Sequence, residues 1–182
     1  MIKAGTQLIH CRIEEIGVDL NFYLSVVYDY NTGDKKKELW TNLRDLAIGM
    51  TTLWLICGDF NALLYPQDKL YGNPVHPTEI AYFSNCSHDL SLNELSWKGE
   101  YYIWTNNQND SDRIYSRIDR VLGNFEWIIQ WDHLVVNYGL PNISEHTHIV
   151  INMTTQSSTK LPFRFFNVRA NHSSFLPLVE KE

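Results

Sequence analysis

TLWLICGDFNALL (residues 52–64) decides the fold, because an apolar strand ends within it at two polar side chains. The run 53–56 is apolar throughout and predicts a buried strand. Asp59 and Asn61 follow two positions apart, so strand alternation places both side chains on one face. Core packing gives no reason for a carboxylate and an amide here, and this strand end is therefore a candidate functional site.

Composition predicts a single folded domain rather than a disordered chain. The 182 residues are 44% hydrophobic and 13% aromatic, which is enough to bury a core. The formal net charge of −6 argues against tight binding along a phosphate backbone, which needs many Lys and Arg side chains. It does not exclude a nuclease, because the metal ligands of nucleases are themselves acidic.

The cysteines and the apolar runs indicate a reducing compartment. Cys11, Cys57 and Cys86 form no CxxC pair, so neither a disulfide framework nor a cysteine-type zinc site is predicted. The N-terminal residues contain no long apolar segment, and no run is long enough to cross a bilayer. We expect an intracellular protein, nuclear or cytoplasmic, that is neither secreted nor held at a membrane. Nothing in the sequence indicates an obligate oligomer.

Helices separate the strands in the first half of the chain, and the second half is mostly β. Residues 6–15 and 21–31 are rich in Ile, Val, Tyr and Phe and predict a hairpin. Apolar spacing and turn residues predict helices over 32–50, 78–92 and 125–132, and further strands over 51–60, 100–106, 115–124, 133–140 and 146–153. We divide the chain into one domain, 1–154, and a C-terminal linker, 155–182, which begins with a Ser- and Thr-rich stretch.

Polar residues also stand at the ends of later strands: Asp119 in SRIDRVL, and Glu145 with His146 in SEHTHI. Phosphodiester hydrolysis needs a divalent metal held by carboxylates, a donor to the phosphoryl oxygens and a base for the attacking water. Asp59, Asn61, Asp119 and His146 supply those groups. Asp119 is the natural partner of His146, because a carboxylate bonded to one ring nitrogen fixes the tautomer and supports the charged imidazole.

Each of these residues also has a structural interpretation. Asp119 lies between Arg117 and Arg120, and in isolation it predicts an ion pair with one of them. Asp59 alone is compatible with a turn, and His146 alone with a hydrogen-bonded core histidine. A purely structural or interaction role gives no reason for four polar residues at strand ends in this order.

A zinc hydrolase is a further alternative, built on a His-x-His pair. His146 and His148 lie two apart on a predicted strand, so they face the same way and form half of a zinc site. No third ligand is obvious among the other histidines, and short motifs often match by chance.

Five motifs in order, with GDFN first, resemble the endonuclease/exonuclease/phosphatase superfamily. They are GDFN (58–61), YYIWTN (101–106), SRIDRVL (116–122), SEHTHI (144–149) and PFRFFN (162–167). More narrowly, the chain is similar to the endonuclease domain of LINE-type (non-LTR) retrotransposons. The resemblance implies an α/β (α+β) fold: a two-sheet β-sandwich flanked by helices, four-layered and DNase I-like.

The resemblance also implies a reaction and a role for each matching residue. The reaction is nicking of DNA with Mg²⁺ or Mn²⁺. Tyr28, in the Tyr-x-x-Asn pattern that it forms with Asn31, would contact the scissile phosphate. Asp59 would position or deprotonate the attacking water, and Asn61 would hold the phosphate. Asp119 would orient His146, as the residue types alone suggest.

The chain departs from the family pattern at the metal side. Family domains begin with a strand that ends in Asn, followed by a strand and loop bearing the principal metal ligand, a Glu; neither is in this sequence, and Glu14 and Glu15 lack that context. Glu145 stands where the family has Asp and is the remaining candidate metal ligand. We therefore expect a fold without its first strands and an impaired hydrolase. The alternative is a catalytically inactive remnant that binds nucleic acid or protein weakly.

Overall fold

The computed structural model describes residues 1–15, 20–31, 33–109, 111–140 and 144–153. The predicted linker 155–182 lies outside these ranges, so the division of the chain at residue 154 stays a prediction. Among the described helices, none combines the length and the apolar character needed to cross a membrane.

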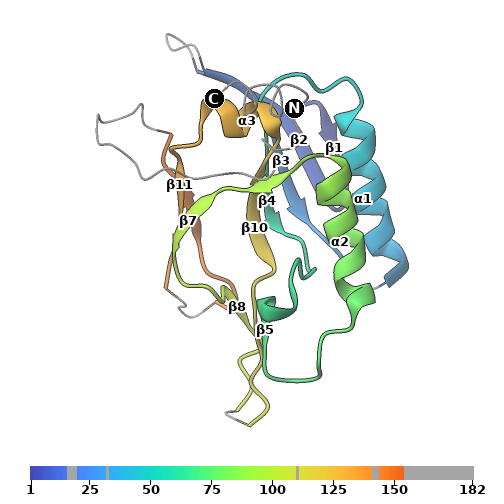
Figure 1. Cartoon of the computed structure of the whole chain (residues 1–182), viewed down its shortest axis with the longest axis vertical. Helices are drawn as coiled ribbons and strands as arrows, with labels where there is room; N and C mark the ends of the chain where they lie inside the picture. The colour runs from blue at the N-terminus through green and yellow to red at the C-terminus, as the bar shows by residue number, and fades with distance from the viewer. Residues whose placement is uncertain (16–19, 32, 110, 141–143, 154–182) are drawn as a thin grey trace, which may run out of the picture.

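A six-stranded sheet forms the centre of the molecule (Figure 1). Its strands, in spatial order, are β1 (Lys3–Ala4), β2 (Leu8–Glu15), β3 (Leu20–Tyr28), β4 (Trp54–Asp59), β10 (Asp119–Gly123) and β6 (Asn93–Glu94). Strands β2 and β3 form the predicted antiparallel hairpin. Strands β3 and β4 are parallel, so they need a crossover, and helix α1 (Gly33–Ala47) supplies it.

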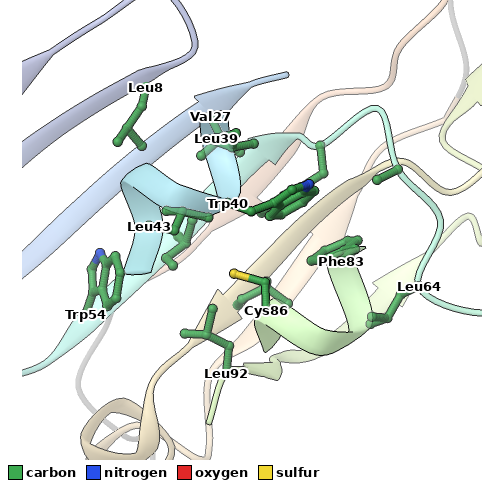
Figure 2. Packing of buried hydrophobic residues seen from close by; sticks show 14 residues of the cluster. Leu8, Val27, Leu39, Trp40, Leu43, Trp54, Leu64, Phe83, Cys86 and Leu92 are labelled. Carbon is green, nitrogen blue, oxygen red and sulfur yellow. The ribbon is translucent and has the colours of Figure 1, made fainter. Parts of the chain in front are cut away.

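Two helices cover one face of this sheet. Helices α1 and α2 (Pro77–Asp89) lie together on the right of the sheet in Figure 1. Trp40 of α1 and Phe83 of α2 stack at a centroid distance of 5.1 Å, as Figure 2 shows, and Phe60 stacks on Phe83 at 4.7 Å. Phe60 is the third letter of GDFN, so the motif is anchored in this core while its polar residues face elsewhere.

The other face of the sheet packs against a second β layer. One three-stranded sheet has the order β12 (Ile149–Ile151), β11 (Val135–Tyr138) and β7 (Ser96–Gly99); the other has the order β5 (Lys69–Leu70), β9 (Tyr115–Ser116) and β8 (Trp104–Thr105). Leu55 and Val121 of the large sheet pack here with Trp127 of the short helix α3 (Phe125–Gln130). The mixed α/β fold that the sequence predicts is thus confirmed.

Some predicted elements differ in extent from those observed. The strand predicted over 100–106 is only two residues long, and the Tyr101 and Tyr102 hydroxyls next to it donate to Asp68 and to the Gln67 carbonyl. Strands β6 and β7 were not predicted, because Asn93 and Glu94 are not strand formers. No predicted helix or strand covers residues 64–77, which contain the 3₁₀ turn η1 (Pro66–Asp68) and strand β5.

Gly58 allows β3 and β4 to approach each other. Its φ is +130°, and a Cβ at this position would lie 2.1 Å from the backbone oxygen of Val27, its register partner on β3. Such a separation is far below van der Waals contact, so any side chain must push the two strands apart. The close approach of the two strands therefore requires glycine at position 58, the first residue of GDFN.

We predict that Gly58→Ala lowers the free energy of unfolding by about 2–4 kcal/mol, through steric overlap and a disfavoured φ. Gly49→Ala is the matched control, because Gly49 also has a positive φ, +75°, but no atom lies within 4 Å of its added Cβ. The control costs about 1–2 kcal/mol. Urea unfolding measures both, and equal losses would contradict the close-approach argument.

Candidate active site

Three candidate residues lie in one row across the large sheet. Tyr28 pairs in register with Asp59 across β3 and β4, and Asp59 pairs with Asp119 across β4 and β10. Residues in one register row point to the same face of a sheet. The Phe60 amide donates to the Ile118 carbonyl at 3.0 Å, which makes Asp59–Asp119 a non-hydrogen-bonded pair, the type with the closer side chains.

His146 lies between the two carboxylates of this row. Its Nδ1 is 2.9 Å from Asp119 Oδ2, and its Nε2 is 3.9 Å from Asp59 Oδ2. A β-bridge to Trp104 holds the backbone of His146, and the Thr147 amide donates to the Ile103 carbonyl at 3.0 Å. The predicted contact between Asp119 and His146 is therefore present, and an Nδ1–H that donates to Asp119 leaves Nε2 facing Asp59.

Burial sets the electrostatics of the row. Asp59 is only 7% exposed, and this burial raises its pKa to about 6. The Asn61 amide opposes the rise, the charge of Asp119 adds to it, and the charges of His146 and Lys36 oppose it. The pKa of Asp119 is likewise raised by burial and lowered by its hydrogen bond to His146. Two like charges on paired strands repel, and the imidazole is the group placed to offset them.

Asn61 holds Asp59 in place. Its backbone amide donates to Asp59 Oδ1 at 2.7 Å, and its Nδ2 donates to Asp59 Oδ2 at 3.0 Å and to the Asp29 carbonyl at 2.8 Å. Its φ is +43°, a left-handed conformation that Asn tolerates better than most residues. Both Nδ2 protons are thus used within the protein, so donation to a phosphate requires one of these bonds to open.

The other predicted residues lie at the rim of the row. Tyr28 is 65% exposed, and Asn31 is exposed just beyond the end of β3. Glu145 is also exposed, and among the described residues no hydrogen bond or ion pair reaches its carboxylate. The His148 ring packs on Gly139. Within the described ranges, no group of three or more His, Cys, Asp or Glu residues could hold a metal, which leaves the zinc alternative without its third ligand.

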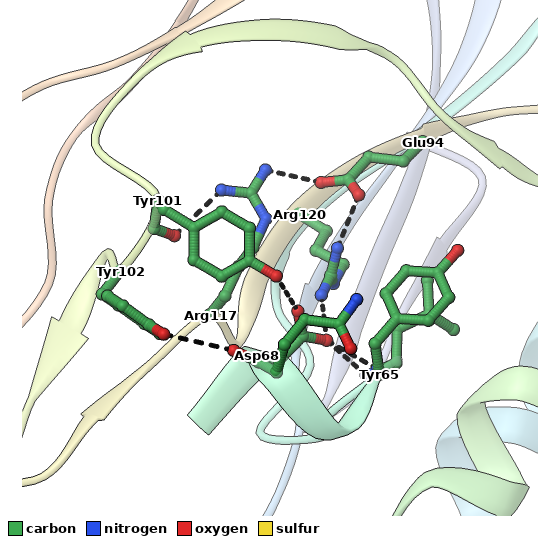
Figure 3. Close-up of polar contacts among 9 residues, drawn as sticks. Tyr65, Asp68, Glu94, Tyr101, Tyr102, Arg117 and Arg120 are labelled. Atoms are coloured by element: carbon green, nitrogen blue, oxygen red, sulfur yellow. Dashed lines mark hydrogen bonds and ion pairs between the residues drawn. The ribbon is translucent and has the colours of Figure 1, made fainter. Parts of the chain in front are cut away.

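The arginines that flank Asp119 pair with other acids. Arg120 forms ion pairs with Asp68 and with Glu94, and Arg117 pairs with Glu94 at 2.6 Å, as Figure 3 shows. Both guanidinium groups are 1% exposed. The sequence alternative in which Asp119 pairs with one of them is therefore wrong, and Asp119 stays available to His146.

Asp68 connects this ion-pair network to the loop that follows GDFN. Its Oδ2 accepts the amides of Leu64 and Tyr65 at 2.9 and 2.7 Å, and its Oδ1 accepts the Tyr101 hydroxyl at 2.8 Å. The loop carrying Asn61 and the strand carrying Asp119 are thereby tied together through Arg120. Asp68 was not predicted from the sequence. Its only signal there is an acid three residues after Tyr65, and from that position it caps the η1 turn.

Comparison with known proteins gives structural neighbours only. No protein-family model matches the chain, and no curated protein matches its sequence. The endonuclease domain of TRAS1, a telomere-specific non-LTR retrotransposon, superposes with a TM-score of 0.63 at 16% identity, covering 83% of this chain and 65% of that domain. The 3′ phosphatase NExo from Neisseria, bound to a product DNA hairpin, gives 0.59 at 17% identity, covering 82% and 65%.

A beta hairpin deletion mutant of beta toxin from Staphylococcus aureus gives a TM-score of 0.50 at 13% identity, covering 88% of this chain and 55% of the toxin. The chain therefore spans less than two thirds of the length of these neighbours. Identities this low show the fold alone, a DNase I-like mixed α/β fold that the chain shares with these neighbours.

We predict that Arg120→Met lowers the free energy of unfolding by about 3–5 kcal/mol, because it leaves the buried Asp68 carboxylate without its cation. Arg44→Met is the control, since Arg44 pairs with Asp89 at the surface, where an ion pair contributes about 1 kcal/mol or less. Chemical denaturation of both variants measures the difference. A loss for Arg120→Met as small as that of the control would contradict a buried, coupled network.

We predict that His146→Ala raises the pKa of Asp119 further, because a hydrogen-bond donor and a neighbouring cation are lost. Carbon-detected NMR of the aspartate carboxyl groups over pH 3–9 measures the change. His148→Ala leaves the Asp119 titration unchanged, since its ring packs on Gly139. An unchanged Asp119 titration in His146→Ala would contradict the contact.

Proposed function

We propose that this chain carries a phosphodiester hydrolase centre of endonuclease type that acts on DNA, as in LINE-type retrotransposons. The observation that supports it most is the placement of His146, bonded to Asp119 through Nδ1 and facing Asp59 through Nε2. An orienting carboxylate, a histidine and a second acid with a perturbed pKa form a typical acid–base arrangement. The DNase I-like fold is consistent with this reaction class but does not by itself establish it.

In the proposed reaction each residue acts at a stated atom. Asp119 Oδ2 accepts a hydrogen bond from the Nδ1–H of His146 and supports the charged ring, whose Nε2–H then donates a hydrogen bond to a phosphoryl oxygen as charge develops there. Asp59, with a pKa of about 6, is ionised at neutral pH and takes a proton from the attacking water. The water oxygen bonds to phosphorus as the P–O bond to the leaving strand end breaks, and that leaving oxygen takes a proton from solvent. Tyr28 and Asn31 contact the phosphate from the exposed rim.

A divalent ion, Mg²⁺ or Mn²⁺, is the cofactor that the resemblance implies. Magnesium is usually held by one or two carboxylates together with substrate phosphates and water. Among the described residues, Glu145 is exposed and is joined to no other acid, and no metal-holding cluster forms. The described residues therefore do not make a complete metal site.

A plasmid-nicking assay with Mg²⁺ or Mn²⁺ tests the proposal. We expect Asp59→Ala and His146→Ala each to reduce nicking by about 10²–10⁴-fold, because each removes a group that transfers or stabilises a proton. His148→Ala is the matched control and retains activity. Wild-type activity falls below about pH 6 as Asp59 becomes protonated. Equally weak nicking by wild type and all variants would refute the proposed hydrolase activity.

A second candidate is a catalytically inactive domain that binds nucleic acid weakly. Two observations favour it: both Nδ2 protons of Asn61 are engaged by Asp59 and Asp29, and no described acid accompanies Glu145. Binding of a labelled DNA hairpin, followed by fluorescence anisotropy, separates the two candidates. Binding that is unchanged by His146→Ala, without nicking in any metal, supports the inactive domain.

A further inference from the structure

Asp29 lies directly behind the row and has no role in the reaction described above. It follows Tyr28 at the end of β3 and is 1% exposed. Its amide donates to the Asp59 carbonyl at 2.8 Å, and its carbonyl accepts Asn61 Nδ2 at 2.8 Å. The backbone of Asp29 thus contacts both polar residues of GDFN.

The side chain of Asp29 is only half satisfied as a carboxylate. Its Oδ1 accepts Gln7 Nε2 at 2.7 Å and the Tyr30 amide at 2.8 Å. Among the described residues, no hydrogen-bond partner reaches its buried Oδ2 or the buried Oε1 of the same Gln7. Gln7 Nε2 also donates to the Lys35 carbonyl at 3.1 Å, which fixes the orientation of the amide. Two buried acceptors of one contacting pair are therefore both without a donor.

One proton removes this deficit. A protonated carboxyl has one O–H donor and keeps an acceptor oxygen, and a primary amide offers both an acceptor and donors. A proton on Asp29 Oδ2 gives this contacting pair a donor, and Gln7 Oε1 is the unpaired acceptor that such a donor can serve. Leaving buried polar atoms unpaired is costly, so the surroundings favour the protonated form.

The charged groups around Asp29 come from two neighbouring elements. Lys36 of α1 faces it and also bonds through Nζ to the Asn61 carbonyl at 2.5 Å, and Asp59 of β4 faces it from the next strand. Burial raises the pKa of Asp29 to about 7; the Tyr30 amide, Lys36 and Gln7 oppose this rise, and Asp59 adds to it. The ammonium of Lys35 lies over the Tyr30 ring instead.

We infer that Asp29 is a positioning residue that acts as a neutral acid: its protonated carboxyl pairs with Gln7, and its backbone holds Asp59 and Asn61. Ionisation of Asp29 would place a further negative charge behind two residues that must meet a phosphate. The protein thus keeps an acid there that is largely uncharged below neutral pH. The positioning role rests on the proposed function, whereas the presence of the proton does not.

Stability as a function of pH tests the proton. For a carboxyl whose pKa is raised by folding, the native state loses stability as pH rises above the unfolded pKa, and the loss is complete above the folded one. Asp29→Asn keeps the Oδ1 acceptor and removes the titration. We expect its folding equilibrium constant to exceed that of wild type by about 100- to 1,000-fold at pH 8 and to equal it near pH 3.5.

Asp45→Asn, an exposed aspartate of α1, is the matched control and shows no such divergence. Parallel pH curves for wild type and Asp29→Asn would overturn the inference. If Asp29→Asn does not fold, the carboxyl carbon of Asp29 in the wild-type protein decides the question by NMR. A midpoint above pH 6 supports the neutral acid, and a midpoint near pH 4 refutes it.

Nicking tests the positioning role separately. Above pH 7, wild-type kcat/KM falls at least about fivefold by pH 8.5 relative to Asp29→Asn, since ionised Asp29 places a new negative charge close to the phosphate. A constant ratio of the two proteins across this range refutes the role. If wild type nicks no DNA, the proposed function and the positioning role both fail, and the carboxyl titration still decides the proton.

Discussion

The repulsion between Asp59 and Asp119 is the constraint on which the candidate site depends. Strand pairing places the two carboxylates directly opposite each other, in the closer of the two antiparallel pair types, and burial removes the water that would screen them. Such a pair is tolerated only with donors or cations around it. His146 bridges the two acids, and Asn61 donates twice to Asp59. The same repulsion raises the pKa of Asp59, so this carboxylate takes up a proton more readily.

The arginines nearest to this pair form their ion pairs with other acids, although the charge of Arg117 still lowers the pKa of Asp119. Arg117 and Arg120 flank Asp119 in sequence, yet their guanidinium groups are neutralised by Glu94 and Asp68. Arg117 also lies over the rings of Trp97 and Tyr138, 4.1 and 4.7 Å from the centroids, and so joins the large sheet to the second layer. An arginine bonded to Asp119 would hold a fixed positive charge there, whereas the histidine that does bond to it can gain and lose a proton.

Sequence reasoning found the parts of this site that depend on local pattern. The apolar run before Asp59 predicted β4, helical spacing predicted α1 and α2, and the chemistry of the residue types predicted the contact between Asp119 and His146. It could not find Asp29 with Gln7, because 22 residues separate them and only tertiary packing buries both. Strand β5 was not predicted, and β8 and β9 are short parts of the strands predicted over 100–106 and 115–124, since their pairing partners, not their own residues alone, set their extent.

The row of Tyr28, Asp59 and Asp119 has a consequence for how the chain folds. Its members come from strands that are distant in sequence, and His146 is added from later still. Contacts of such long range form late, since the entropy of closing large loops must be overcome first. During synthesis, β2, β3, α1 and β4 can associate before β10 has emerged from the ribosome. The candidate site is therefore assembled only after the residues that carry Asp119 and His146 have been made.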